Sequence, residues 1–478
     1  MRGVNMYALD SFLSLNLTEV STKIKQGEIS PVDIVTALIN RIDTVDSKLN
    51  SYITVNREGA LATAKEREKE VLEGKYRGPL HGIPIGLKDL INTKGLKTTC
   101  GSSIFENHIP DENAELVNRL EEAGAIIIGK NNTHQFAYGP TGDRSHVGPV
   151  RNPYNIKKMT GGSSSGSAAS VAACLNYGTI GTDTGGSVRI PASFCGVVGM
   201  KPTYGRVSKR GIYPLSWTLD HAGPLTRSIM DNALVLNAIS GYDPLDPDSK
   251  ETDQEDFSRY IGLGIEGKVI GIPKSYYYEN LDPEIEQSIY QAIDCFKRLG
   301  ASIVEVDIPS MEEISEAQKV ILKSEAYAVH ENNLKEFPEL WDEEVKERLL
   351  TGLNVSGSDF AKALRVQKIA KQEFANVLDS VDVLLTPTMS ILPPDVNARF
   401  LSDDYDDSQH IRWQILKLTA PTDLNGFPSL TLPSGFSKEG LPIGVQLIGM
   451  EFEEAKLYQF GYAIEQELSL NLNRVEIE

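Results

Sequence analysis

Short apolar segments alternate with amphipathic helices along most of this chain, and no other feature restricts its fold as much. Strands are predicted at residues 125–128, 269–272, 302–306, 381–385, 429–432 and 443–448. Helices are predicted at 113–123 and 282–299, and each is followed by a glycine of the kind that ends helices. This alternation predicts an α/β fold with a large mixed β-sheet core covered by helices on both faces.

The first 75 residues are predicted to be a helical N-terminal part. Their clearest helix start is Ser30, a capping residue, followed by Pro31 at the first helical position. Residues 242–256 and 396–409 are polar and are predicted to be surface loops, not domain boundaries. We therefore expect residues 1–478 to form a single domain that begins with this helical part.

The chain is acidic, with 66 Asp and Glu against 47 Lys and Arg and a formal charge of −19. This argues against direct nucleic-acid binding, which needs clustered cations. No apolar run is long enough to span a membrane and no signal-peptide pattern is found, so a cytoplasmic protein is expected. The cysteines lack the spacing of a zinc site and are expected to be reduced thiols, so no metal or cofactor is predicted.

Residues 161–205 are unusually rich in glycine, which supplies ten of these 45 positions against 40 of 478 in the whole chain. Glycine at this density indicates backbone in unusual conformations or in close contact with another group. Hydroxyl side chains are interleaved with the glycines, at Ser163, Ser164, Ser165, Ser167, Thr182, Thr184 and Ser187. The flanking segments are apolar and compact, which excludes a flexible Gly/Ser linker.

Two local motifs offer competing interpretations. Residues 124–131 have the spacing of a phosphate-binding loop, but they lack its final Ser or Thr and are predicted to contain a strand, so this interpretation is rejected. Residues 162–166 match GxSxG, which would make Ser164 the nucleophile. That motif needs a preceding strand, and residues 151–160 are polar and predicted to form a poor one. No histidine lies in a convincing acid–base setting, but the Ser164 alternative stays open.

Lys88 offers a base that is not histidine. A serine can be activated by a neutral lysine, and burial in an apolar site lowers the lysine pKa enough for this role. Lys88 lies in the apolar, glycine-containing segment 81–89. The alternative is that its ammonium group reaches solvent or pairs with Asp89. Residue types alone leave both interpretations open.

Three segments together resemble the amidase signature family: residues 82–89 (GIPIGLKD), 161–167 (GGSSSGS) and 181–192 (GTDTGGSVRIPA). The resemblance extends over nearly the whole chain and is densest at 78–230, with a further match at 428–449. It implies the amidase signature fold and hydrolysis of a small-molecule amide through an acyl-enzyme. Three motifs in the same order and spacing are far more specific than GxSxG alone.

The resemblance also implies a Ser–cisSer–Lys triad. Matched motif by motif, Ser187 is the nucleophile, Ser163 the bridging serine after a cis peptide, and Lys88 the base. The expected oxyanion hole consists of backbone N–H groups, those of Thr184, Gly185 and Gly186 together with that of Ser187. Asp183 and Arg189 are expected either to hold this loop or to form an ordinary structural pair.

The family includes free-standing amidases and the glutamine-hydrolysing A subunit of the tRNA-dependent amidotransferase, which works with partner subunits. That glutaminase is expected to have Gln after Arg189, where this chain has Ile190, and a basic pair where this chain has residues 346–348 (KER). It also has an acidic residue for the glutamine amine near the position of Leu416. These differences favour a free-standing hydrolase, for which a homodimer is the generic expectation. A catalytically inactive binding protein is the remaining alternative, and the filled triad positions argue against it.

Overall fold

The computed structural model describes residues 12–401, 410–470, 475 and 477. Its main feature is an 11-stranded mixed sheet with the order β1-β3-β2-β6-β8-β7-β12-β13-β11-β9-β10. The strands of this sheet are β1 Tyr52–Val55, β2 Pro84–Lys88, β3 Ile126–Asn131, β6 Gly178–Asp183, β7 Val198–Lys201, β8 His221–Thr226, β9 Val269–Pro273, β10 Ser302–Val306, β11 Val383–Pro387, β12 Ser429–Phe436 and β13 Pro442–Ile448. The α/β fold with a large mixed sheet is therefore confirmed.

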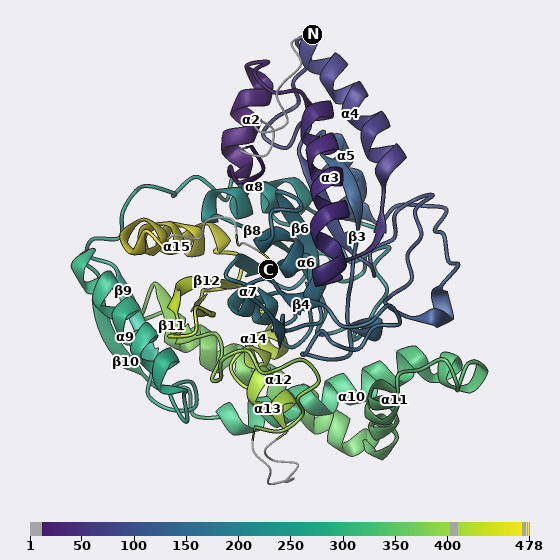
Figure 1. Cartoon of the computed structure of the whole chain (residues 1–478). Helices are drawn as coiled ribbons and strands as arrows, with labels where there is room; N and C mark the ends of the chain where they lie inside the picture. The colour runs from purple at the N-terminus through teal and green to yellow at the C-terminus, as the bar shows by residue number, and fades with distance from the viewer. Residues whose placement is uncertain (1–11, 402–409, 471–474, 476, 478) are drawn as a thin grey trace.

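Helices surround this sheet (Figure 1). The α-helices are α2 Leu17–Lys25, α3 Pro31–Leu49, α4 Arg57–Leu72, α5 Glu115–Glu122, α6 Ser165–Ala172, α7 Arg189–Cys195, α8 Ile229–Ile239, α9 Pro283–Arg298, α10 Met311–Glu336, α11 Glu343–Leu350, α12 Gly357–Leu378, α13 Ile411–Leu416, α14 Ala420–Asn425 and α15 Glu454–Leu468. Short 3-10 turns lie at Ser103–Phe105, Gln135–Ala137 and Thr351–Asn354. None of the helices in the described ranges is long and apolar enough to cross a bilayer.

The strands bury side chains on both faces. In β3, Ile127 packs into a core formed with α2, α5 and α8, whereas Ile126 and Ile128 pack into a separate core with α3 and α4. Successive residues of a strand point to opposite faces, so these two cores lie on opposite sides of the sheet. Near the other end, Leu384 of β11 packs against α10 and α12, and its neighbours Val383 and Leu385 face the first core. The helices therefore cover both faces, as predicted.

The N-terminal part differs from the prediction in one respect. Ser30 caps α3 by accepting a hydrogen bond from the Val32 amide at 2.9 Å, and Pro31 begins the helix as expected. Between α3 and α4, however, β1 pairs antiparallel with β3 at the sheet edge. The prediction that residues 1–75 are helical is therefore wrong at Tyr52–Val55, because four residues flanked by long helices give too short a pattern to stand out. Residues 1–11 of this part lie outside the described residues.

A second correction concerns the segment before the glycine-rich stretch. The strands β4, Arg151–Asn152, and β5, Asn155–Met159, form a separate two-stranded ribbon, although this segment was expected to make a poor strand. Asn152 stabilises the ribbon, because its side chain donates to the Met159 carbonyl and accepts from the Tyr154 amide, both at 3.0 Å. A partly exposed ribbon needs no continuous apolar run, which is why a polar sequence can form it.

The two expected surface loops are only partly as predicted. Residues 242–256 contain no helix or strand, but Asp243 and Asp246 are buried in them. Of the loop at 396–409, residues 402–409 lie outside the described residues.

The four cysteines, Cys100, Cys174, Cys195 and Cys295, are buried and free.

Candidate active site

Two neighbouring parallel strands bring the predicted residues to one edge of the sheet. Strand β2 ends at Lys88 and pairs in parallel with β6, which ends at Asp183 and leads into the loop carrying Ser187. The carboxyl ends of parallel strands in an open sheet border the crevice in which ligands bind. The motifs at 82–89 and 181–192 therefore meet here although about 100 residues separate them.

Lys88 is fully buried and held by two hydroxyl groups. Its Nζ donates to Ser163 Oγ and to Thr182 Oγ1, both at 2.7 Å. Asp89 does not pair with it, since the Asp89 carboxylate accepts from the Thr99 amide at 2.9 Å and from the Thr99 hydroxyl at 2.6 Å. The alternative of a solvent-reaching or Asp89-paired Lys88 is therefore wrong. Thr182 was not identified from the sequence as a partner of this lysine.

Burial controls the charge of this lysine. Removal from water lowers the pKa of Lys88 to about 7, against the opposing attraction of Asp220 and Asp183. A substantial fraction of the side chain is then neutral near pH 7. A neutral amine hydrogen-bonded to a serine hydroxyl can accept the proton of that hydroxyl.

Ser163 lies beside the loop that carries Ser187. The peptide bond between Gly162 and Ser163 is cis, and the amide of the next residue, Ser164, donates to the Ser187 carbonyl at 3.2 Å. The Ser163 carbonyl is fixed from the other side by the Thr133 hydroxyl at 2.9 Å. Lys88, Ser163 and the Ser187 backbone are thus parts of one connected group.

Asp183 organises the loop around Ser187. Its carboxylate accepts from the Gly186 amide at 2.5 Å and from the Val188 amide at 3.1 Å. Gly186 has φ +128°, and a Cβ there would overlap the Thr419 hydroxyl, so this position requires glycine. The Gly186 N–H, expected in the oxyanion hole, is therefore already engaged by Asp183.

The neighbouring carbonyl groups are held by side chains from distant segments. The Thr419 hydroxyl donates to the Gly185 carbonyl at 2.7 Å, and the Gln318 amide donates to the Thr184 carbonyl at 3.1 Å. Within the described part of the chain, no acceptor is hydrogen-bonded to the amides of Gly185 and Ser187. These two N–H groups remain available to a ligand.

Arg189 joins Asp183 to a second buried carboxylate, Asp423. Its Nε lies 2.9 Å from Asp183, its Nη2 lies 2.7 Å from Asp423, and all three side chains are fully buried. Burial alone would raise the pKa of Asp183, but the attraction and hydrogen bonds of Arg189 outweigh it and hold that pKa well below its usual range. The Asp183–Arg189 pair therefore holds the loop through the hydrogen bonds of Asp183.

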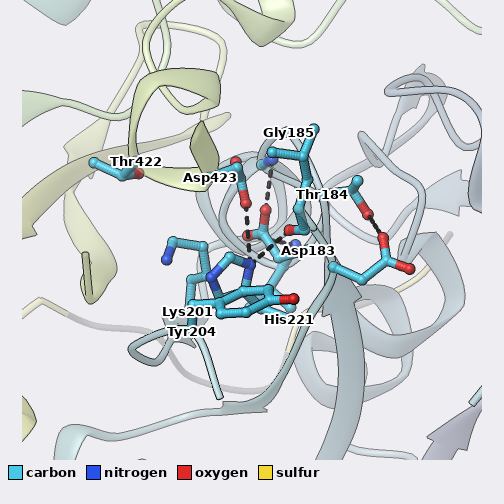
Figure 2. Close-up of polar contacts among 12 residues, drawn as sticks. Asp183, Thr184, Gly185, Lys201, Tyr204, His221, Thr422 and Asp423 are labelled. Atoms are coloured by element: carbon cyan, nitrogen blue, oxygen red, sulfur yellow. Dashed lines mark hydrogen bonds and ion pairs between the residues drawn. The ribbon is translucent and has the colours of Figure 1, made fainter. Parts of the chain in front are cut away.

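His221 contacts this network at Asp423, and the charge of Lys201 acts on the same carboxylate (Figure 2). His221 places Nδ1 2.7 Å from the Leu219 carbonyl and 3.6 Å from Asp423. Lys201 is fully buried, and removal from water lowers its pKa to about 7. Asp423, His221 and Lys201 were missed by sequence reasoning, because none of them lies in the three motifs quoted for the resemblance.

A pocket opens over the Ser187 loop, and we refer to it as the Ser187 pocket. It is lined by Ala137, Tyr138, Gly139, Pro140, Thr184, Gly185, Ser187, Leu215, Gln318, Lys319, Leu322, Lys323, Arg348, Thr351, Arg412, Trp413 and Leu416. Neither Asp nor Glu is found among these lining residues. Leu416, at the position where an acidic residue would bind a glutamine amine, is one of the apolar wall residues.

Ser164, the alternative nucleophile, faces the backbone. Its hydroxyl donates to the Thr182 carbonyl at 3.0 Å and accepts from the Thr182 amide at 3.2 Å. It is fully buried and does not line the Ser187 pocket. A strand does precede the GxSxG segment, contrary to expectation, but this strand is β5 of the separate ribbon and not a strand of the main sheet.

Comparison of the sequence with known proteins identifies relatives over most of the chain. The Amidase family model matches residues 33–458. The A subunit of glutamyl-tRNA(Gln) amidotransferase from Geobacter sp. (strain M21) is 39% identical over 97% of this chain and 99% of its own length. Further bacterial relatives, 35–39% identical, have the same name.

Solved structures agree in fold. One of them comes from a vestigial protein complex, which is described as revealing the evolutionary origins of an s-triazine catabolic enzyme. It aligns with a TM-score of 0.91 and 31% identity, and the alignment covers 97% of this chain and all of that one. The peptide amidase of Stenotrophomonas maltophilia aligns with a TM-score of 0.85 and 30% identity, covering 98% and 99% of the two chains. Both the sequence match and the fold lead to one assignment: the chain belongs to the amidase signature family, whose members cleave amide C–N bonds.

Proposed function

We propose that this chain hydrolyses a carboxylic amide with Ser187 as the nucleophile, Ser163 as the relay and Lys88 as the base. The hydrogen bond of 2.7 Å between the fully buried Lys88 Nζ and Ser163 Oγ carries the proposal. It joins a lysine that burial makes partly neutral to a serine beside the Ser187 loop. The position of Ser187 in the pocket lining gives a substrate access to the nucleophile.

The reaction follows from these positions. Neutral Lys88 takes the proton of Ser163, which takes the proton of Ser187 as the Ser187 Oγ forms a bond to the amide carbonyl carbon. The amides of Gly185 and Ser187, with that of Thr184, stabilise the oxyanion, since Asp183 occupies the Gly186 amide. The C–N bond then breaks, and the relay returns the proton to the leaving nitrogen. Water attacks the acyl-enzyme with the same assistance and releases the acid.

A free-standing amidase and the glutaminase subunit of an amidotransferase would share this chemistry. The names of the relatives favour the glutaminase subunit. The sequence differences favoured a free-standing hydrolase. The curated relatives are instead named as A subunits of glutamyl-tRNA(Gln) amidotransferase, which fits a glutaminase that works with partner subunits better. This second candidate is retained for that reason.

The residues of the Ser187 pocket support the free-standing hydrolase. Glutamine carries an α-ammonium group, which needs an acidic partner when it is taken out of water. The pocket lining has Leu416 where that partner is expected, and no other lining residue is acidic. Four lining residues are cationic and would repel the ammonium group. We therefore propose a free-standing amidase whose substrate has no amine in the acyl part.

Glutamine and glutaramate, which differ only in the α-amine, separate the two candidates. We expect the purified chain alone to release ammonia from glutaramate at least about tenfold faster than from glutamine, because an unpaired buried ammonium costs more than ~1.4 kcal/mol. The measurement is kcat/KM for both amides, with Ser187→Ala as the blank. Glutaminase activity that appears only with partner subunits and glutamyl-tRNA would favour the second candidate instead.

A further inference from the structure

One face of α10 forms a wall of the Ser187 pocket. This helix contributes Gln318, Lys319, Leu322 and Lys323 to the lining. Lys319 and Lys323 are four residues apart, so their side chains lie next to each other on the same helix face. Two like charges at this spacing cost stability unless an anion balances them.

Carboxylates among the described residues neutralise the cationic side chains of the pocket only in part. Lys319 forms an ion pair at 2.5 Å with Glu316, whose side chain is 70% exposed and does not line the pocket. Lys323 forms no ion pair within the described ranges. Arg348 pairs with Glu344 at 2.6 Å, but this carboxylate also pairs with Arg144 and Arg399, so the pocket retains an excess of positive charge. This excess is notable in a chain with a net charge of −19.

Trp413 of α13 gives these cations a defined position. The Nζ of Lys319 lies 4.8 Å and that of Lys323 lies 6.0 Å from the centre of the indole ring. Contact of an ammonium group with the face of an indole is attractive. One aromatic surface therefore gathers both lysine side chains at the pocket.

The lining also has an apolar part, formed by Leu215, Leu322 and Leu416. We propose that the substrate is an amide whose acyl group carries a carboxylate at its far end, the monoamide of a short dicarboxylic acid. Ser187 receives the amide, the apolar wall packs against the methylene chain, and Lys323 with Lys319 binds the carboxylate. This inference rests on the proposed function and assigns the two lysines as residues that determine specificity.

Matched substrates and variants test the inference. The anionic series is succinamate, glutaramate and adipamate, and hexanamide is the neutral reference. The wild-type chain is expected to hydrolyse the best anionic amide with a kcat/KM at least about tenfold above that of hexanamide, because a hydrogen bond between charged groups contributes this much. Lys323→Gln is expected to remove most of this preference, with an increase in KM that is much larger for the anionic amides than for hexanamide. Lys335→Gln, which removes an exposed charge from the same helix, is expected to change neither value.

The outcomes separate this inference from the proposed function. Equal hydrolysis of anionic and neutral amides, or equal loss for both in Lys323→Gln, would overturn the carboxylate assignment while leaving the amidase intact. Charge reversal in Lys323→Glu should shift the preference toward the cationic 5-aminopentanamide, and an unchanged preference would also count against it. If none of these amides is cleaved in a Ser187-dependent manner, the proposed function fails first.

Discussion

Replacement of Ser187 by alanine is expected to lower kcat/KM for the preferred amide by about four to six orders of magnitude. The variant loses the atom that forms the acyl-enzyme, and residual catalysis by the oxyanion donors and by substrate binding is small in comparison. The side chain is small and lines the pocket, so the fold should tolerate the change. Initial rates of ammonia release at several enzyme concentrations measure the loss.

Ser164→Ala is the matched control for this prediction. It removes the hydroxyl of the other candidate nucleophile, which is hydrogen-bonded to the Thr182 backbone at 3.0 and 3.2 Å. The expected cost is about 1–3 kcal/mol of unfolding free energy, since the buried Thr182 groups lose their partner, with kcat/KM reduced less than about tenfold. A large loss in Ser164→Ala with an active Ser187→Ala would restore the GxSxG interpretation.

Replacement of Lys88 by methionine is the second large effect, with an expected loss of kcat/KM of about 100-fold to 10,000-fold. Methionine retains the length of the side chain but has no group that accepts the Ser163 proton. Because the pKa of Lys88 is about 7, wild-type kcat/KM should rise as the pH increases through 7, when the lysine becomes neutral. This rise in kcat/KM between acidic and neutral pH, the acidic limb of the pH profile, should be absent from the residual activity of Lys88→Met.

Lys130→Met controls for the loss of a buried lysine as such. Lys130 is fully buried on the adjacent strand β3 and donates to the hydroxyls of Thr93 and Thr98 at 3.1 and 3.0 Å. Its replacement is expected to lower the unfolding free energy but to keep the acidic limb near pH 7. If the rise of kcat/KM near pH 7 shifts in Lys130→Met and persists in Lys88→Met, the assignment of Lys88 as the base is contradicted.

Unfolding measurements show whether Lys88→Met loses activity through instability. The folded-state pKa of Lys88 is lowered, so between about pH 7 and the unfolded-state value near 10.4 the unfolded chain binds more protons at this position. The contribution of Lys88 to stability therefore improves with increasing pH across this window, and at pH 7 its burial is unfavourable. Lys88→Met should be at least as stable as the wild type at pH 7.

The sequence predicts six of the eleven strands of the central sheet, those with nearly continuous apolar runs. Segments such as 269–272 and 443–448 are nearly continuous apolar runs, and the observed strands Val269–Pro273 and Pro442–Ile448 agree with them within about one residue. Strands β2, β6, β7 and β8 were not predicted although they are fully buried, because glycine or polar residues interrupt their apolar runs. Two other missed elements have no apolar run at all. Tyr52–Val55 is short and at the sheet edge, and Asn155–Met159 is polar because its ribbon is partly exposed.

The candidate site is only partly predictable from the sequence. Lys88, Ser163 and Ser187 lie in motifs whose residue types indicate chemistry. Thr182, by contrast, is one of many hydroxyl residues until the fold places it 2.7 Å from Lys88. Asp423 is 234 residues from Arg189 along the chain, and no local pattern pairs an acid with an arginine at that separation. Such contacts depend on how α14 packs behind the nucleophile loop.

Covalent labelling tests the central claim most directly. Phenylmethanesulfonyl fluoride forms a bond from sulfur to an activated serine Oγ and releases fluoride. Trypsin leaves residues 159–189 as one peptide that contains Ser163, Ser164 and Ser187, so fragment-ion mass spectrometry must locate the adduct. A single adduct on Ser187 that is absent from Ser187→Ala and strongly slowed in Lys88→Met is the predicted result. An adduct on Ser164, or labelling that persists in Ser187→Ala, would contradict the assignment.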